Sequence, residues 1–125
     1  MARPTLLVAE KEPAQALSTR KLILETGKFN VLTAHSVQEA VEICEGTPLL
    51  AAMIATADLG AKVEKLVRET KKRRPKLTII CLSPNRTEKM TGADHHVSSH
   101  EPEELLELCK KLFGDPRRSH DERRL

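Results

Sequence analysis

Short apolar runs alternate with amphipathic stretches along most of the chain. A run of about four to eight apolar residues is typical of a buried strand, whereas apolar residues three or four positions apart indicate a helix with one buried side. Because the two patterns strictly alternate, we expect an α/β fold with a parallel sheet covered by helices on both faces. The runs predict strands at residues 5–9, 30–34, 49–55, 77–82 and 95–98, and the amphipathic stretches predict helices at 13–26, 37–46, 59–70, 84–90 and 102–112.

The ends of the expected helices have local signals. Ser36 followed by Glu39 forms a capping box at the start of the second helix. Gly27 follows the first helix at a position where a left-handed residue is expected. Pro75 stops the third helix, and Pro102 suits the first turn of the last one.

One domain and a short tail account for the sequence. A chain of 125 residues has the length of a single domain. From Asp115 onward the composition becomes polar and charged without periodicity, which is typical of a flexible segment. We therefore expect a domain at residues 1–113 and a flexible basic tail at residues 114–125.

The composition favours a cytoplasmic protein and narrows the classes of ligand. No apolar run approaches the roughly 20 residues needed to cross a bilayer, so no contact with a membrane is expected. Cys44, Cys81 and Cys109 lie within apolar patterns and are expected to be reduced core residues. Aromatic residues are limited to Phe29 and Phe113, which disfavours the stacking of nucleic-acid bases.

Two basic clusters stand out against a net charge of only +3. One lies in the tail, at residues 117–124. The other lies at the end of the third expected helix. Cations at the C-terminus of a helix are favoured by its dipole, so a solvated helix end explains this cluster. Nucleic acid is therefore an unlikely partner, and the alternative of polyanion binding predicts a steep salt dependence. The cluster at the helix end consists of Lys71, Lys72, Arg73, Arg74 and Lys76.

The sequence has no arrangement of residues typical of an enzyme or a cofactor site. His95 and His96 are neighbours on an expected strand, so their side chains point to opposite faces and cannot share a metal ion. The loop after the first strand is charged and lacks the glycines of a phosphate-binding or dinucleotide-binding turn. The serines have no nucleophile-elbow context. We therefore expect no enzymatic activity, no metal and no cofactor.

Five motifs occur in a recognisable order and at matching distances. They are the segments 6–13, 34–40, 79–83, 92–94 and 101–106, which read LLVAEKEP, AHSVQEA, IICLS, GAD and EPEELL. Together they resemble a response-regulator receiver domain over about residues 4–113. The resemblance implies a doubly wound, flavodoxin-like (βα)5 domain whose five-stranded parallel sheet has the order 2-1-3-4-5.

The resemblance also implies positions for a phosphoryl-transfer site. In receivers an acidic pair after the first strand and an aspartate ending the third strand hold Mg²⁺, and this aspartate accepts the phosphoryl group. The acidic pair falls on Glu10 and Lys11, so an ammonium group stands where a cation should bind. The acceptor falls on Ala55, or on Ile54 or Thr56 if the register differs by one residue. None of the three can form an acyl phosphate.

Other receiver positions are also changed. Ser83 matches the hydroxyl group expected after the fourth strand, but the expected lysine after the fifth falls on Ser99, or on Ser98 with a one-residue gap. Asp58 lies three residues beyond Ala55, and a receiver rescued by this carboxylate is an alternative. The departures predict a degenerate, metal-free cleft composed of Glu10, Lys11, Ala55, Asp58, Ser83 and Ser99.

These observations predict a pseudo-receiver, a non-enzymatic module of a bacterial signalling pathway that binds other proteins without aspartyl phosphorylation. The expected partner is a histidine kinase, another regulator or a second copy of the chain. The expected interaction surface, near the fifth strand and the last helices, includes His96, Glu104 and Leu108. His96 resembles a receiver switch position; it is either a pH-sensitive contact or simply a half-exposed polar residue.

Overall fold

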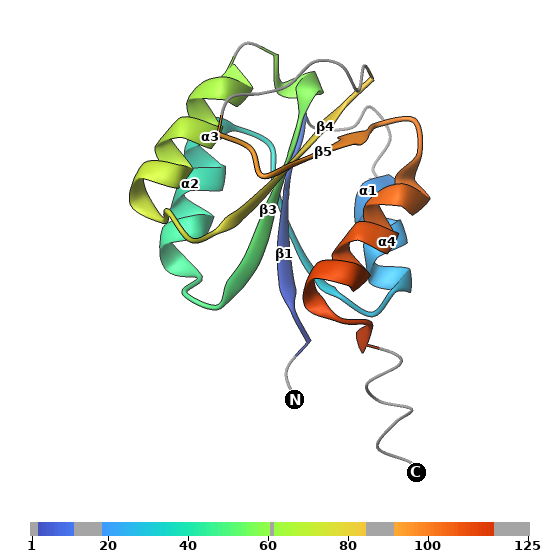
Figure 1. The fold of residues 1–125 in the computed structure, drawn as a ribbon. Coiled ribbons are helices and arrows are strands. Elements are labelled where there is room, and N and C mark those ends of the chain that lie inside the picture. Colours follow the sequence, from blue (N-terminus) through green and yellow to red (C-terminus); the bar gives the residue numbers. More distant parts are fainter. Residues whose placement is uncertain (1–2, 12–18, 61, 85–91, 117–125) are drawn as a thin grey trace.

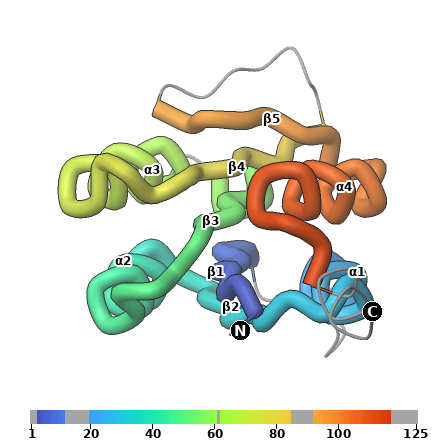
Figure 2. The backbone as a smooth tube through the Cα atoms, turned by 60° about the horizontal axis from the view of Figure 1, so that its bottom comes forward, coloured from blue at the N-terminus to red at the C-terminus, as the bar shows by residue number. Residues whose placement is uncertain are grey.

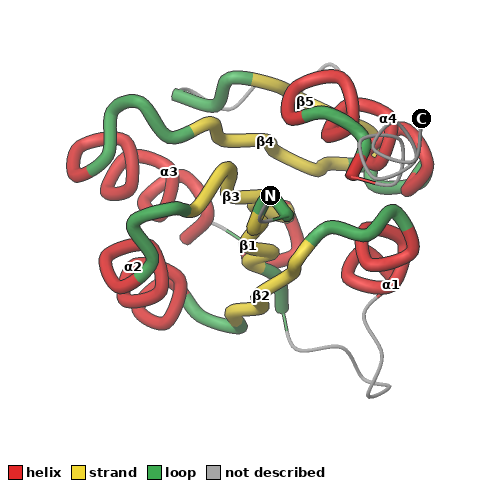
Figure 3. The backbone as a smooth tube through the Cα atoms, turned by 90° about the horizontal axis from the view of Figure 1, so that it is seen from below, coloured by secondary structure: helices red, strands yellow, loops and turns green. Residues whose placement is uncertain are grey.

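The strands form one parallel sheet. A computed structural model describes residues 3–11, 19–60, 62–84 and 92–116. The strand order is β2-β1-β3-β4-β5, and every neighbouring pair is parallel (Figure 3). The predicted fold class and strand order are therefore confirmed. The strands are β1 Thr5–Ala9, β2 Asn30–Ala34, β3 Leu50–Thr56, β4 Thr78–Ser83 and β5 His95–Ser98.

Helices cover both faces of this sheet (Figures 1 and 2). Helices α2 and α3 lie on one face, and α1 and α4 lie on the other. The helix predicted at 84–90 and the first part of the one predicted at 13–26 fall almost wholly outside the described residues. The helices are α1 Thr19–Thr26, α2 Val37–Gly46, α3 Lys62–Arg73 and α4 Pro102–Phe113.

Alternation along the strands divides the core into two apolar layers. In β1, Leu7 belongs to the layer under α2 and α3, whereas Leu6 and Val8 belong to the layer under α1 and α4. Successive side chains of a strand point to opposite faces, so both faces must be apolar where both are covered. This is why the strands read as nearly continuous apolar runs in the sequence.

The third helix begins later than its periodicity predicts. The sequence predicts a start at residue 59, but a 3-10 turn, η1 Ala57–Leu59, comes first and α3 begins at Lys62. Gly60, with φ of 76°, interrupts the helical path between them. The side chain of Leu59 still packs against the core, which explains why it matched the apolar pattern.

The end of α1 differs from the expectation at Gly27. The left-handed residue is Lys28, with φ of 70°, and Gly27 does not have a positive φ. The Phe29 amide donates to the Leu24 carbonyl at 3.2 Å and the Lys28 amide to the Glu25 carbonyl at 2.9 Å, as in a Schellman motif. Glycine at position 27 has a steric reason instead. A Cβ there would lie 2.6 Å from Cδ1 of Leu106 on α4.

The signals at two other helix starts are confirmed. The Ser36 hydroxyl accepts a hydrogen bond from the Glu39 amide at 3.1 Å, so Ser36 is the N-cap of α2. Pro102 lies in the first turn of α4, where its missing N–H leaves no helical bond unmade.

Helix α4 ends at Phe113, and Gly114 caps it through a hydrogen bond to the Lys110 carbonyl. The division into a domain at 1–113 and a flexible tail at 114–125 stays a prediction, because residues 117–125 lie outside the described residues. None of the described helices has both the length and the apolar character needed to span a membrane.

Candidate functional site

A buried glutamate follows the first strand at the carboxyl edge of the sheet. Ligands of open α/β sheets bind outside this edge, so its polar residues are the first candidates for function. Glu10 is only 1% exposed. The Glu10 amide donates to the Ala34 carbonyl at 3.0 Å, and Nδ1 of His35 lies 3.2 Å from the carbonyl oxygen of Glu10. The end of β1 is thereby fixed to the end of β2.

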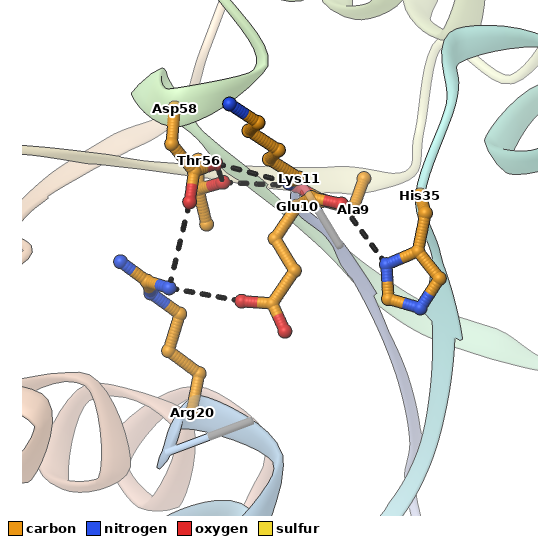
Figure 4. Close-up of polar contacts among 7 residues, drawn as sticks. All are labelled: Ala9, Glu10, Lys11, Arg20, His35, Thr56 and Asp58. Carbon is orange, nitrogen blue, oxygen red and sulfur yellow. Dashed lines mark hydrogen bonds and ion pairs between the residues drawn. The ribbon is translucent and has the colours of Figure 1, made fainter. Parts of the chain in front are cut away.

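Arg20 neutralises this glutamate. Its Nη1 lies 2.9 Å from Oε2 of Glu10, and the same nitrogen lies 3.7 Å from Oδ2 of Asp58. Figure 4 shows the arginine reaching from α1 to both carboxylates, whereas the ammonium group of Lys11 lies away from it. The cation beside Glu10 is therefore Arg20 and not Lys11, contrary to the sequence-based expectation.

Asp58 joins the same cluster from the 3-10 turn η1. Its Oδ1 accepts a hydrogen bond from the Lys11 amide at 3.2 Å and a second one from the Thr56 hydroxyl. Oδ2 faces Arg20. The carboxylate thus has three donors around it, although 39% of the side chain remains exposed. We call Glu10, Arg20, Thr56 and Asp58 the cleft cluster.

One oxygen atom of the cleft cluster has no donor among the residues that the structure describes. Oε1 of Glu10 is buried and accepts no hydrogen bond from any described residue. Buried polar atoms are nearly always paired, because an unpaired one loses the hydration it had in water. This oxygen therefore marks the point in the cluster where a further donor or cation would be stabilised.

The structure shifts the end of the third strand by one residue from its predicted place. β3 ends at Thr56 and not at Ala55. Ala55 is 0% exposed and packs in the apolar layer under α2 and α3, so it does not line a cleft. Thr56 is 1% exposed, and its hydroxyl also lies 3.3 Å from the Ala9 carbonyl. Thr56, one of the two alternatives named for the acceptor position, is thus the last residue of the strand, and the match to the acceptor stays a prediction.

The serines lie at the same edge, on β4 and just after β5. Ser83 and Ser98 are partners in the β4–β5 register, and both are buried. The Ser99 amide donates to the Ser83 carbonyl at 2.9 Å. The residue that stands beside Ser83 within the sheet is therefore Ser98, while Ser99 contributes a backbone contact.

The basic cluster at the end of α3 is largely occupied by contacts within the protein. Arg74 donates to three carbonyl groups at the C-terminal end of α2 and just beyond it, those of Cys44, Thr47 and Pro48, at 2.9–3.1 Å. Arg73 forms ion pairs with Glu45 and Glu69. Three of the five cations of the cluster, counting Lys71 described below, thus have intramolecular partners.

Lys71 binds the loop before β5 through an ion pair with Asp94. Its Nζ lies 2.8 Å from Oδ2 of Asp94 and donates to the Leu77 carbonyl at 3.0 Å. The Ile79 amide also donates to Asp94 at 2.8 Å. Partial desolvation raises the pKa of Asp94, but the hydrogen bonds from Lys71 and Ile79 and the charge of Lys71 outweigh it, so the net pKa is lowered.

The predicted interaction surface is divided between two faces of the sheet. His96 is the β5 partner of Cys81, which packs under α3, and so its side chain points to that face. Glu104 and Leu108 lie on α4, on the opposite face, and Leu108 packs against the core. The structure therefore brings Glu104 and Leu108 together and places His96 apart from them.

The cysteines and the acidic groups provide no second site among the described residues. Cys44, Cys81 and Cys109 are buried free thiols. Burial raises the pKa of Cys81 to about 11 and that of Cys109 to about 12. No group of three or more histidine, cysteine, aspartate or glutamate side chains is placed to hold a metal ion in the part of the chain described here.

Two residues of the cleft cluster were not predicted in their present roles. Arg20 had a signal in the sequence, since a buried carboxylate after a strand needs a cation and α1 begins nearby. The sequence could not select between Arg20 and its neighbour Lys21. Thr56 was considered only as a shifted register, because strand ends are not fixed by apolar pattern alone.

Comparison with solved structures finds many proteins of the same architecture. A receiver domain protein of Methanospirillum hungatei is 20% identical, with a TM-score of 0.74, and the match covers 88% of this chain and 93% of that one. The regulator TrrA of Thermotoga maritima, solved with Mg²⁺ and BeF, is 24% identical, with a TM-score of 0.71 and coverage of 88% and 99%. A sensor protein of a Polaromonas species is 22% identical, with a TM-score of 0.75 and coverage of 89% and 96%.

Neither a scan against protein-family models nor a search of curated proteins finds a match. The likeness is therefore one of three-dimensional structure, and it agrees with the strand order and the placement of the helices described above. The chain has the fold of the response-regulator receiver domains.

Proposed function

We propose that this chain is a pseudo-receiver, a non-enzymatic cytoplasmic signalling module of a two-component pathway that acts by binding another protein. Aspartyl phosphorylation does not switch it. The observation that supports this proposal most directly is that β3 ends in Thr56, while the carboxylates nearest to it are both held by Arg20.

The chemistry of the cleft cluster supports the absence of a phosphoryl switch. An acyl phosphate forms only on a carboxylate that is able to attack, and a threonine hydroxyl cannot form one. Asp58 is the exposed carboxylate of the cluster, but donors from Lys11, Thr56 and Arg20 surround it. These donors stabilise the carboxylate and so reduce its reactivity as a nucleophile.

The likeness to receivers and to a sensor protein supports a protein partner. The partner that we propose is a histidine kinase, another regulator or a second copy of the chain. The surface proposed for it is the side of α4 that carries the half-buried Glu104. The polyanion alternative is disfavoured, because Lys71, Arg73 and Arg74 already contact groups of the protein itself.

The first experiment tests phosphorylation directly. The purified chain is incubated with acetyl phosphate and Mg²⁺, and its intact mass is measured beside that of a receiver with an acceptor aspartate. We expect the control to gain a phosphoryl group and this chain to gain none. A phosphoryl group that is absent from the Asp58→Asn variant would instead favour a receiver that uses Asp58 as its acceptor.

The second experiment tests the partner. The chain is cross-linked in extract of its source cells, and the recovered proteins are compared for the wild type, Asp58→Asn and Glu104→Lys. We expect the same signalling partner with the wild type and Asp58→Asn, and its loss with Glu104→Lys. A partner whose recovery depends on acetyl phosphate would contradict a constitutive module. Recovery of no kinase or regulator would contradict the proposed class of partner.

A further inference from the structure

The receiver fold implies a divalent cation at the carboxyl edge of the sheet, and the cleft cluster allows a test of this implication. Mg²⁺ and Ca²⁺ are held by about six or more oxygen ligands at distances of about 2.0–2.6 Å. Oε2 of Glu10 and Oδ2 of Asp58 both face Nη1 of Arg20, at 2.9 and 3.7 Å. An ion within bonding distance of both oxygens would occupy the space of that nitrogen. The described residues do not fit a divalent cation.

We propose that Arg20 is a built-in counter-ion that takes the place of a divalent cation between Glu10 and Asp58, and that removal of its charge uncovers a cation site. The inference deepens the proposed function, since it explains why the cleft needs no metal. It depends on the cleft cluster alone and not on any partner.

Electrostatics gives the expected size of the effect. Charges of +1 and +2 held about 4 Å apart repel each other enough to weaken binding by a factor of about 30, even at the dielectric constant of water. The actual cluster is partly buried, so screening is weaker than in water. Arg20 therefore excludes a divalent cation both by its volume and by its charge.

The unpaired oxygen of Glu10 supports the second half of the proposal. Oε1 is buried and accepts no hydrogen bond from the described residues, so Glu10 has one oxygen bound to Arg20 and one without a donor. Without the guanidinium group, both oxygens of Glu10 and Oδ2 of Asp58 would lack a cation. Three carboxylate oxygens from two residues form a favourable partial set of ligands, which water completes.

The test uses Mn²⁺ alone as the probe. Titration of the isotope-labelled chain is followed by the paramagnetic broadening of the backbone amide signals of Lys11 and Asp58. For the Arg20→Met variant we expect selective broadening at a concentration about 30-fold lower than for the wild type, or lower still. Arg20→Lys keeps the charge and should behave like the wild type.

Further variants identify the ligands. Adding Glu10→Gln or Asp58→Asn to Arg20→Met should remove the selective broadening. Arg73→Met is the matched control, because Arg73 also faces two carboxylates, those of Glu45 and Glu69, but lies on α3. It should leave the signals of Lys11 and Asp58 as they are in the wild type.

Two outcomes would overturn the proposal. One is a wild type whose Lys11 and Asp58 signals broaden at the same Mn²⁺ concentration as those of Arg20→Met. The other is a folded Arg20→Met variant with no selective broadening. If Arg20→Met does not fold, Arg20→Gln, which also lacks the charge, takes its place. Phosphorylation of the wild type would contradict the proposed function without changing these titrations, so the two failures are distinguishable.

Discussion

Arg74 donates a hydrogen bond to the carbonyl group of Cys44, 30 residues earlier in the chain, at 3.1 Å. The same guanidinium group also donates to the carbonyls of Thr47 and Pro48. The last carbonyls of a helix have no partner within it, so Arg74 supplies donors that α2 itself lacks. A cation of the basic cluster, which the polyanion alternative would use for a ligand, thus links the end of α3 to the end of α2.

Substitution of Arg74 is expected to destabilise the fold. Arg74→Ala should lower the free energy of unfolding by about 2–3 kcal/mol, because each hydrogen bond from a charged donor contributes about 1.5–3 kcal/mol and water replaces part of the loss. Arg74→Lys should restore only part of it, since an ammonium group cannot reach three acceptors in the same way. Urea denaturation measures both. The exposed Lys72→Ala is the control, and an equal effect there would contradict the assigned role.

The ion pair of Glu10 and Arg20 should show strong coupling in a double-mutant cycle. Arg20→Met leaves a buried carboxylate without its cation and should cost about 3 kcal/mol of stability. Glu10→Gln removes that charge, so the double variant should be more stable than Arg20→Met alone. Thermal or urea unfolding of the four proteins gives the coupling energy. Additive effects of the two substitutions would show that the pair does not act as a unit.

Gly27 and Lys28 should respond in opposite ways to substitution. Gly27→Ala places a methyl group against Leu106 and should destabilise the protein by about 1–3 kcal/mol, as other overpacked contacts do. Lys28→Gly relieves the left-handed backbone of a non-glycine residue and should stabilise it by up to about 1 kcal/mol. The midpoints of urea denaturation of the two variants and of the wild type measure these changes in stability. A stabilising Gly27→Ala would show that Leu106 moves aside without cost.

The contact of Asp94 with Lys71 should make stability depend on pH in one direction. The pKa of Asp94 is lowered in the folded protein from its usual value of 3.8, so the folded state binds the proton less readily than the unfolded state. The stabilisation is complete above that value and is lost as the pH falls through the lowered pKa. Because the carboxylate is partly exposed, its contribution should stay within about 1 kcal/mol.

Denaturation at a series of acidic pH values checks this prediction. The Asp94→Asn variant should be less stable than the wild type at neutral pH. The difference between their free energies of unfolding should shrink as the pH decreases. A difference that grows on acidification would contradict the direction of the pKa shift.

The buried cysteines should resist thiol reagents. Burial holds the pKa of Cys81 at about 11 and that of Cys109 at about 12, so at pH 8 about one Cys81 thiol in a thousand is ionised. We expect labelling by a disulfide reagent to be at least about 100-fold slower in the native protein than in denaturant. Absorbance of the released thiolate follows the reaction. Rapid native labelling would show that the thiols are accessible, and a cysteine-free peptide mixture serves as the blank.

The sequence predicted the sheet better than the site. A strand buried on both faces appears as an apolar run, and this is why β1 was predicted with the bounds that the structure has. The edge strands β2 and β5 are less apolar and less buried, but their predicted bounds also match. Gly27 was misinterpreted because a glycine after a helix usually supplies the left-handed residue, while here packing against α4 requires it. The role of Arg20 was missed because its side chain reaches from α1 to carboxylates on other elements, and apolar patterns do not encode such contacts.

Helix α1 and the residue that follows it contact both the cleft cluster and α4. Arg20, near the start of α1, forms ion pairs with Glu10 and Asp58. Gly27, just beyond the end of α1, packs closely against Leu106 of α4. The two positions are about 10 Å apart along one short rod. Because α1 makes the first contact and is directly followed by the second, the placement of Arg20 at the cleft and the close packing of α4 both depend on where this one short helix lies.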